Sequence, residues 1–275
     1  MKKAIVFILC VIAGFFVFVF GIGVYLSKPV NHSVSMPNIF ESVVFKGTHG
    51  SLLNAGSNEV CALLMHGVRS NRSSMVGRSR FLKEHSITSL LIDLQGHGET
   101  PGKMITFGIR ESRDAENGVE FLGEVEKCKK IIAIGQSLGG ASALLGDEPV
   151  NVDAFILESV YPTIEEAVED RLEIRLGALG RLLAPLIYLQ IPLRIDSDLS
   201  ELRPIDVLTK VKVPVFIISG TKDKHTKPEE TKRMYEAVHS KKRLWLVEGA
   251  SHEDIFYFDK ADYERKVLDF IKDVL

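Results

Sequence analysis

The chain has 275 residues, of which 45% are hydrophobic and 25% are charged, and its formal net charge is −2. This composition is typical of a globular protein and excludes a disordered chain, a coiled coil and a collagen-like fibre. The near-zero net charge also lacks the basic surplus of a nucleic-acid-binding protein, so we expect no nucleic-acid partner. Three cysteines are too few for a disulfide-rich scaffold, and their spacing fits no zinc site.

A long apolar segment begins the chain. Lys2 and Lys3 precede the uncharged stretch Ala4–Leu26, and Lys28 ends it. As a helix this stretch would measure about 35 Å, enough to cross a hydrocarbon core of about 30 Å. A cleaved signal peptide is the alternative, but its apolar core is usually about 7–15 residues long. We predict a single-pass transmembrane anchor at residues 1–28, with a cytoplasmic N-terminus and the rest of the chain periplasmic or extracellular.

The remaining sequence alternates strand-like and helix-like segments. Residues 29–38 are expected to form a short polar linker, and residues 39–275 one domain. Apolar runs predict strands at 41–46, 60–65, 87–93, 131–135, 152–158, 213–219 and 243–247. Helical periodicity between them predicts an α/β fold, with a mostly parallel sheet flanked by helices. Residues 160–205 hold no strand and predict a small helical cap.

A G-x-S-x-G pattern lies between a predicted strand and a predicted helix. It reads Gly135-Gln136-Ser137-Leu138-Gly139. In a nucleophile elbow the serine occupies a sharp strand-to-helix turn, where side chains two residues away would collide. The start of the helix also favours negative charge beside the serine. The pattern predicts a nucleophilic Ser137, and the alternative is a glycine-rich turn with an incidental serine.

Two more polar side chains, Asp223 and His252, each follow the end of a predicted strand. A nucleophilic serine needs a base, and that base needs an orienting carboxylate. Because the carboxyl ends of parallel strands share one edge of a sheet, we expect Ser137, Asp223 and His252 to meet there. Glu158, at another strand end, is the alternative to Asp223.

An H-G pair ends the strand predicted at 60–65. Such a pair commonly precedes a residue whose backbone N–H forms half of an oxyanion hole, and the N–H after the nucleophile forms the other half. Here these residues are Val68 and Leu138, acting through their backbones. We expect His66 to be structural. Arg69 could contact an anionic group, although a solvated loop arginine is the simpler interpretation.

Together these motifs resemble the α/β-hydrolase superfamily, in particular its bacterial serine aminopeptidase-like or BEM46-like branch. The matching segments are 66–68, 93–98, 106–108, 135–140, 220–223 and His252. The resemblance covers the chain from about residue 40 to its end. It implies an α/β-hydrolase fold with an eight-stranded sheet and a Ser-His-Asp catalytic triad.

The resemblance and the residues together indicate a serine hydrolase of the carboxylesterase, lipase or thioesterase type. It would cleave an ester or thioester through an acyl-enzyme intermediate and would require no metal or other cofactor. The expected partners are a small-molecule ester or acyl substrate and the membrane. One alternative is a peptidase or aminopeptidase of the same fold. The other is a catalytically silent binding module, although all three triad positions are filled.

Two features of the cap concern the substrate. Its aliphatic residues are Leu172, Leu176, Leu179, Leu182, Leu183, Leu186, Ile187 and Leu189. They suggest an acyl-chain pocket at the membrane surface, although packing of the cap onto the sheet is the simpler interpretation. A peptidase would need a group that binds a free α-amine. Glu165, Glu166, Glu169 and Asp170 are candidates, although a solvated helix face explains them as well.

Cys61 and Cys128 lie near the starts of two strands that the resemblance places side by side. In an oxidising compartment they could form a disulfide. Two free buried thiols are the simpler expectation.

Overall fold

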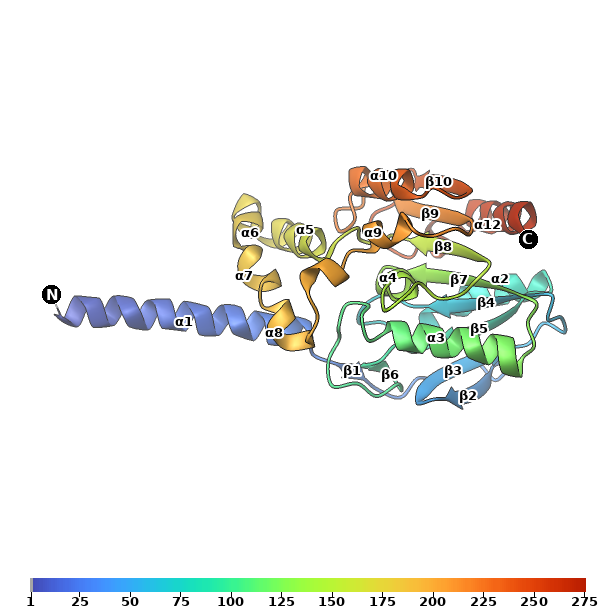
Figure 1. Ribbon diagram of the computed structural model, residues 1–275, viewed down its shortest axis with the longest axis horizontal. Coiled ribbons are helices and arrows are strands. Elements are labelled where there is room, and N and C mark those ends of the chain that lie inside the picture. Colours follow the sequence, from blue (N-terminus) through green and yellow to red (C-terminus); the bar gives the residue numbers. More distant parts are fainter. Residues whose placement is uncertain (1) are drawn as a thin grey trace.

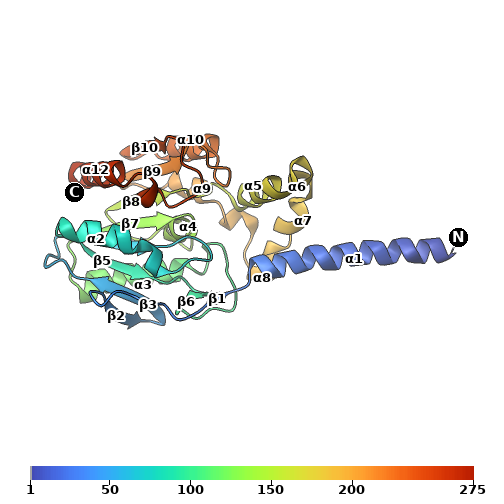
Figure 2. The same cartoon turned by 180° about the vertical axis from the view of Figure 1, so that it is seen from behind.

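The computed structural model describes the backbone of residues 2–275 and their side chains, except that of Ile12. Two parts stand out in Figure 1. The helix α1 (Lys2–Leu26) projects from a domain in which helices cover both faces of a central sheet. The view from behind in Figure 2 shows the C-terminal end of α1 beside a group of short helices at one side of the domain.

Eight strands form the main sheet. In spatial order they are β10 (Lys242–Val247), β9 (Val215–Gly220), β8 (Ala154–Glu158), β7 (Lys130–Gln136), β4 (Val60–Met65), β5 (Thr88–Ile92), β3 (Thr48–Leu53) and β2 (Glu41–Phe45). The six strands from β10 to β5 run parallel, and β3 is antiparallel to both β5 and β2. The expected mostly parallel eight-stranded sheet is confirmed.

Sequence patterns had indicated seven of these strands. The eighth, β3, begins with Thr48, His49 and Gly50, so it lacks the continuous apolar run of a central strand. It is nevertheless almost wholly buried. Hydrogen bonds to β5 on one side and to β2 on the other hold β3 in the sheet, although its sequence pattern does not predict a strand.

The central strands divide the apolar side chains between two cores. In β4, Cys61, Leu63 and Met65 face one core, and Ala62 and Leu64 face the other. This follows from the two-residue period of a strand. The first core is covered by α3 (Ser112–Glu120), the π-helical turn η2 (Phe121–Val125), α4 (Leu138–Leu144) and α10 (Pro228–Ala237). The second is covered by α2 (Val76–Glu84), α11 (Ile255–Phe258) and α12 (Lys260–Val274).

The expected helical cap follows β8. It consists of α5 (Ile164–Leu176), α6 (Ala178–Leu183), α7 (Pro185–Tyr188), α8 (Ile191–Ile195) and the 3₁₀ turn η3 (Leu199–Glu201), before α9 (Pro204–Leu208). Pro185 and Pro192 stand in the first turns of α7 and α8, where a missing N–H costs little. By length and composition alone, two stretches could cross a membrane, Lys2–Leu26 and Ala178–Ile195. The second is divided among α6, α7 and α8.

Several contacts attach the end of α1 to the domain. The Ile105 N–H donates to the Ser27 carbonyl oxygen at 2.8 Å, and α1 contacts α7. Directly after α1, the short strand β1 (Val30–Asn31) pairs with β6 (His97–Gly98). The start of the segment expected to be a linker is therefore hydrogen-bonded to the domain. A further 3₁₀ turn, η1 (Arg72–Met75), precedes α2.

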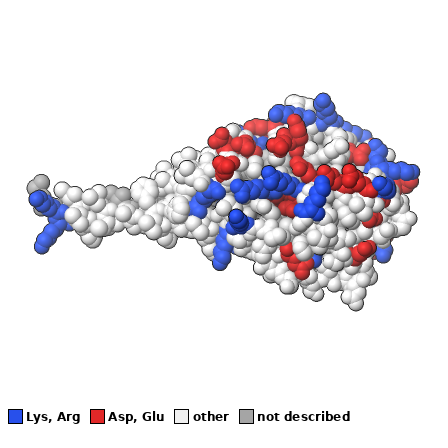
Figure 3. All heavy atoms as spheres, turned by 60° about the horizontal axis from the view of Figure 1, so that its bottom comes forward, with Lys and Arg blue, Asp and Glu red and all other residues white. Residues whose placement is uncertain are grey.

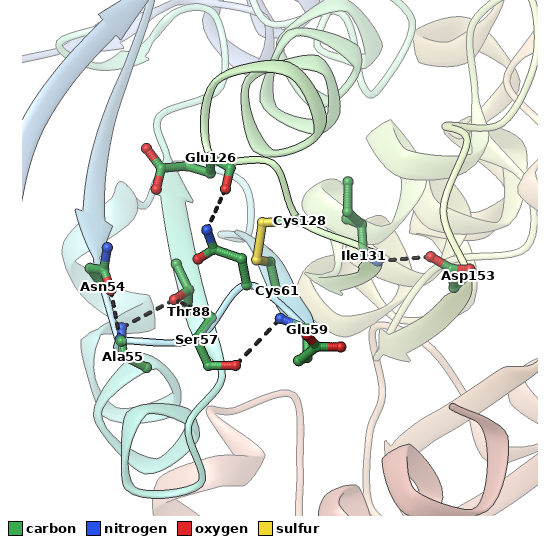
Figure 4. The surroundings of a disulfide bond; sticks show 12 residues. Asn54, Ala55, Ser57, Glu59, Cys61, Thr88, Glu126, Cys128, Ile131 and Asp153 are labelled. Atoms are coloured by element: carbon green, nitrogen blue, oxygen red, sulfur yellow. Dashed lines mark hydrogen bonds between the residues drawn. A yellow bond between two sulfur atoms is a disulfide. The ribbon is translucent and has the colours of Figure 1, made fainter.

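The expectation of two free thiols at Cys61 and Cys128 is wrong, because the structure contains a disulfide between them. Cys61 lies on β4 and Cys128 just before β7, and the two strands are parallel neighbours (Figure 4). This pairing holds the two Cα atoms 5.9 Å apart, within the usual range for a disulfide. Cys10, on α1, is free and exposed.

Candidate active site

Ser137 occupies the turn between β7 and α4. Its backbone has φ 48° and ψ −110°, a strained conformation for a residue with a side chain. A Cβ atom at Gly135 would lie 2.4 Å from the Gly140 nitrogen, and one at Gly139 would lie 2.4 Å from the Met65 carbonyl oxygen. Only glycine fits at both positions, so the local geometry is that of a nucleophile elbow.

Asp223 lies in the turn after β9 and accepts hydrogen bonds on both carboxylate oxygens. The backbone N–H groups of His225 and Thr226 donate to one oxygen at 2.8 and 3.0 Å. The Thr226 hydroxyl, at 2.7 Å, and His252 Nδ1, at 2.8 Å, donate to the other. Burial by itself would raise the pKa of Asp223, but the hydrogen bonds from His252 and Thr226 outweigh it and lower the pKa to about 2.

The bond to Asp223 determines which nitrogen of His252 is free. With its Nδ1–H donated to the carboxylate, the neutral ring presents an unprotonated Nε2. No hydrogen bond joins His252 to Ser137 within the part of the chain that the structure describes. Unliganded sites often leave this contact open until substrate binds. The structure thus joins the predicted aspartate and histidine directly, whereas the predicted serine is not bonded to them.

His225 connects the Asp223–His252 pair to the space around Ser137. Its ring lies 4.8 Å from that of His252, and it lines the same cavity as Ser137. Its buried Nδ1 has no hydrogen-bond partner among the described residues. Burial, followed by the neighbouring His252 and Arg171, lowers the pKa of His225 to about 4, so the ring is neutral near pH 7. Sequence reasoning assigned it no role.

Val68 and Leu138 line the same cavity as Ser137. The backbone N–H of neither residue donates a hydrogen bond to another described group. Free N–H groups of this kind can hold a developing oxyanion. His66 is buried and structural, since its Nδ1 lies 2.7 Å from the Gly67 carbonyl oxygen and its Nε2 accepts from the Leu94 N–H. Burial lowers the pKa of His66 to about 3.

Glu158, the alternative partner for His252, is bonded to other residues. Its carboxylate is buried against Arg78 and Tyr263. Arg78 also forms a salt bridge to Asp254 at 2.8 Å. This network connects the two halves of the site, because the Glu158 carbonyl oxygen accepts the Ser137 N–H at 2.7 Å and Asp254 is two residues after His252.

The cavity has a volume of about 260 Å³ and a largely apolar wall. Ile164, Val168 and Leu172 of α5, together with Ile187 and Ile191, line it from the cap. The end of α1 lines it as well, through Ile22, Gly23 and Leu26, and so does Ser27, which follows α1. The cap leucines divide accordingly. Leu172 faces the cavity, whereas Leu176, Leu179, Leu182 and Leu189 are exposed.

The four acidic cap residues considered for amine recognition are each bonded to a cation outside the cavity. The pairs are Glu165–Arg203, Glu166–Arg233, Glu169–Arg181 and Asp170–Lys227. None of the four lines the cavity. Nor do the described residues contain a cluster of three His, Cys, Asp or Glu side chains that could hold a metal ion.

Comparison with known proteins identifies the family of the chain. A profile of the alpha/beta hydrolase family matches residues 62–265. The chain belongs to the alpha/beta hydrolase family. Within that family it is similar to the uncharacterized protein YqkD of Bacillus subtilis, with 24% identity over 213 residues that cover 76% of this chain and 70% of YqkD.

A second relative bears on the branch of the family. Protein bem46 of Schizosaccharomyces pombe is 25% identical over 196 residues, which cover 70% of this chain and 60% of that protein. The expected resemblance to the BEM46-like branch is confirmed. Among solved structures, the Pyrococcus furiosus esterase Pf2001 matches with a TM-score of 0.72 and 22% identity, covering 90% of this chain and 99% of that one. This likeness shows the shared fold.

Proposed function

We propose that this protein is a serine hydrolase that cleaves carboxylic ester or thioester bonds through an acyl-enzyme intermediate. The observation that carries the proposal is the 2.8 Å bond between Asp223 and His252 beside the cavity that holds Ser137. The free N–H groups of Val68 and Leu138 on the same cavity support it. The paired acidic residues of the cap offer no free carboxylate for an α-amine, so we prefer esters to peptides.

In the proposed mechanism, His252 Nε2 removes the proton from the Ser137 hydroxyl as the oxygen attacks the substrate carbonyl carbon. The N–H groups of Val68 and Leu138 stabilise the resulting oxyanion. Asp223 stabilises the imidazolium, which then gives its proton to the leaving alcohol or thiol. A water molecule, deprotonated by His252, finally cleaves the acyl-serine ester and releases the acid. A rearrangement on substrate binding must first bring Ser137 and His252 into contact.

We further propose that residues 1–28 anchor the protein in a membrane, that residues 29–38 connect the anchor to the domain, and that residues 39–275 lie outside the cytoplasm. Lys2 and Lys3 at the start of α1 support a cytoplasmic N-terminus. The disulfide supports an oxidising compartment. A mass change on reduction of the intact protein purified from cells would support this location. Free thiols throughout would contradict it.

The position of α1 favours a substrate taken from the membrane surface. Its last turn lines the cavity, so an α1 that spans the bilayer would hold the cavity at the bilayer edge. Figure 3 shows a largely uncharged surface along α1, whereas charged side chains are dense over the domain. The cap residues Leu182 (74%), on α6, and Leu193 (86%), on α8, are exposed. Apolar groups exposed to this extent suit the lipid interface.

Substitution of the proposed nucleophile tests the reaction. Ser137→Ala should abolish hydrolysis of p-nitrophenyl butyrate and labelling by a fluorophosphonate probe, because no other hydroxyl lies on the elbow. Ser251→Ala, which removes an exposed hydroxyl next to His252, should retain both. Fluorophosphonate labelling that persisted in Ser137→Ala would refute the assignment.

A series of p-nitrophenyl esters with increasing acyl length tests the proposed membrane substrate. The apolar wall formed by the cap and α1 should keep kcat/KM constant or rising beyond butyrate. A steady fall beyond butyrate would contradict a long-chain substrate.

A further inference from the structure

The cavity wall contains four arginines, Arg69, Arg171, Arg175 and Arg194, and no aspartate or glutamate among the residues described. None of the four forms a salt bridge within the described chain, although many other arginines do. Arg171 and Arg194 are half-buried and lose part of their hydration, a loss that proteins normally compensate with an opposite charge, whereas Arg69 and Arg175 are exposed. The wall therefore carries a positive charge that the chain itself does not neutralise.

Two of these arginines hold α1. Arg69 donates to the Tyr25 carbonyl oxygen at 2.7 Å, and its guanidinium lies 4.9 Å from the centre of the Tyr25 ring. Arg194 donates to the Phe20 carbonyl oxygen at 2.6 Å and lies 4.2 Å from that ring. Contacts with the carbonyl groups and aromatic rings of α1 account for both positions.

The other two, Arg171 and Arg175, have no such explanation. They are one turn apart on the same face of α5, next to Leu172 and Val168. Arg171 is half-buried and donates only to the Ala167 carbonyl oxygen, at 2.8 Å. Arg175 lines the same cavity but is exposed, and it makes no hydrogen bond to the described chain. Burial lowers the pKa of the Arg171 guanidinium, and the carboxylates of Asp223 and Asp170 act on it only through space.

We propose that the substrate is an acyl ester that carries a phosphate group, bound by Arg171 and Arg175 while the acyl chain lies along the apolar wall. Adjacent guanidinium groups present several fixed donors, which suit the terminal oxygens of a phosphate monoester. The same wall offers Ile164, Val168 and Ile187 to a hydrocarbon chain. This inference rests on the proposed function, because it names the substrate class of that site.

The kinetic test uses the full-length protein in micelles of an uncharged detergent. Two substrates share one oleoyl ester, 1-oleoyl-glycerol-3-phosphate and 1-oleoylglycerol, so that only the phosphate differs. We expect kcat/KM to be at least about tenfold higher for the phosphate ester, the usual effect of one charge-assisted hydrogen bond. Equal values for the two substrates would overturn the inference.

Variants of Arg175 show whether the preference comes from α5. Arg175→Gln should lower the ratio of the two kcat/KM values by about tenfold, and Arg175→Lys should restore part of it. Arg181→Gln is the matched control, because Arg181 lies on α6, pairs with Glu169 and does not line the cavity. An unchanged ratio in Arg175→Gln would overturn the inference.

A binding experiment distinguishes failure of this inference from failure of the proposed reaction. Full-length Ser137→Ala is titrated with both lipids in the same micelles, so that no turnover is needed. Tighter binding of the phosphate lipid, weakened by Arg175→Gln, supports the inference even if no ester is cleaved, and equal binding overturns it. Competition with inorganic phosphate shows whether the site recognises a lipid phosphate or free phosphate. The lipid should bind much more tightly than inorganic phosphate, and equal affinities would refute a lipid head group.

Discussion

Two regions that border the cavity differ in how their charged groups are satisfied. In the region formed by the sheet loops, Asp223 accepts four hydrogen bonds, and fully buried Arg78 meets the carboxylates of Glu158 and Asp254. In the region formed by α1 and the cap, Arg175 and Leu193 are both exposed, and Arg175 has no hydrogen-bond or salt-bridge partner in the described chain. We call these the sheet wall and the cap wall.

This difference suggests that the sheet wall serves the proposed reaction and the cap wall serves substrate recognition. Groups of the sheet wall are held by one another, so the orientation of His252 against Asp223 is set before any substrate arrives. The cap wall leaves the Arg175 guanidinium and exposed apolar side chains such as Leu193 without partners in the described chain. Changes to the sheet wall should therefore damage rate and stability, and changes to the cap wall should alter the choice of substrate or surface.

The largest effect on the sheet wall is expected from Asp223→Asn. The amide can neither stabilise an imidazolium nor select the His252 tautomer, so kcat/KM for p-nitrophenyl butyrate should fall by about 10³–10⁴-fold. Asp269→Asn, an exposed change on α12, should leave kcat/KM unchanged. A loss of less than about tenfold for Asp223→Asn would show that His252 does not depend on this carboxylate.

A large loss of stability should follow Arg78→Met. Without the guanidinium, Glu158 and Asp254 lose the cation that compensates their burial, and the free energy of unfolding should fall by about 3–5 kcal/mol. Denaturant unfolding followed by Trp245 fluorescence measures it. Arg265→Met, which removes only exposed pairs with Asp262 and Asp269, should cost less than about 1 kcal/mol. Equal losses in the two variants would contradict the contrast between the walls.

Acid stability tests the Asp223–His252 bond. The pKa of Asp223 is lower in the folded protein than in the unfolded chain, so its stabilising contribution is complete above about pH 4 and is lost as the pH falls through about 2. A shift from 3.8 to about 2 corresponds to about 2 kcal/mol. Unfolding measured between pH 5 and pH 2 should be steeper in the wild type than in Asp223→Asn. Parallel curves would argue against this bond.

The smallest change in stability is expected on the cap wall. Leu193→Trp, in a Trp245→Phe background, should change the free energy of unfolding by less than about 0.5 kcal/mol because the side chain is exposed. Brominated lipids should nevertheless quench its fluorescence in nanodiscs, because we propose that this face enters the lipid interface. Val125→Trp, at an exposed site on η2, should remain unquenched. Equal quenching at both sites would contradict membrane contact by the cap.

Sequence patterns predicted the parts of the site that depend on local geometry. The turn at Ser137 follows from steric collisions that only Gly135 and Gly139 avoid. The meeting of Asp223 and His252 was predictable because both follow strands that end at one edge of a parallel sheet. Their catalytic roles remain predictions, but their position does not depend on the details of packing.

Other features had no local signal. The roles of Arg78 and His225 depend on residues far away in the sequence. His252 bonds Asp223 in the structure, whereas Arg78 and Tyr263 bond the carboxylate of Glu158. From the sequence, Arg171 and Arg175 are expected only as part of a charged helix. The packing of α5 makes both of them line the cavity.

By itself, the sequence determined the alternation of strands and helices, the elbow and the order of the polar residues after the strands. These depend on backbone conformation and on side chains a few residues apart. Only the tertiary structure decided that β3 joins the sheet, that Cys61 and Cys128 are bonded, and that the end of α1 borders the cavity. Those outcomes depend on which distant surfaces pack together, because the contacts that favour them exist only once the chain has folded.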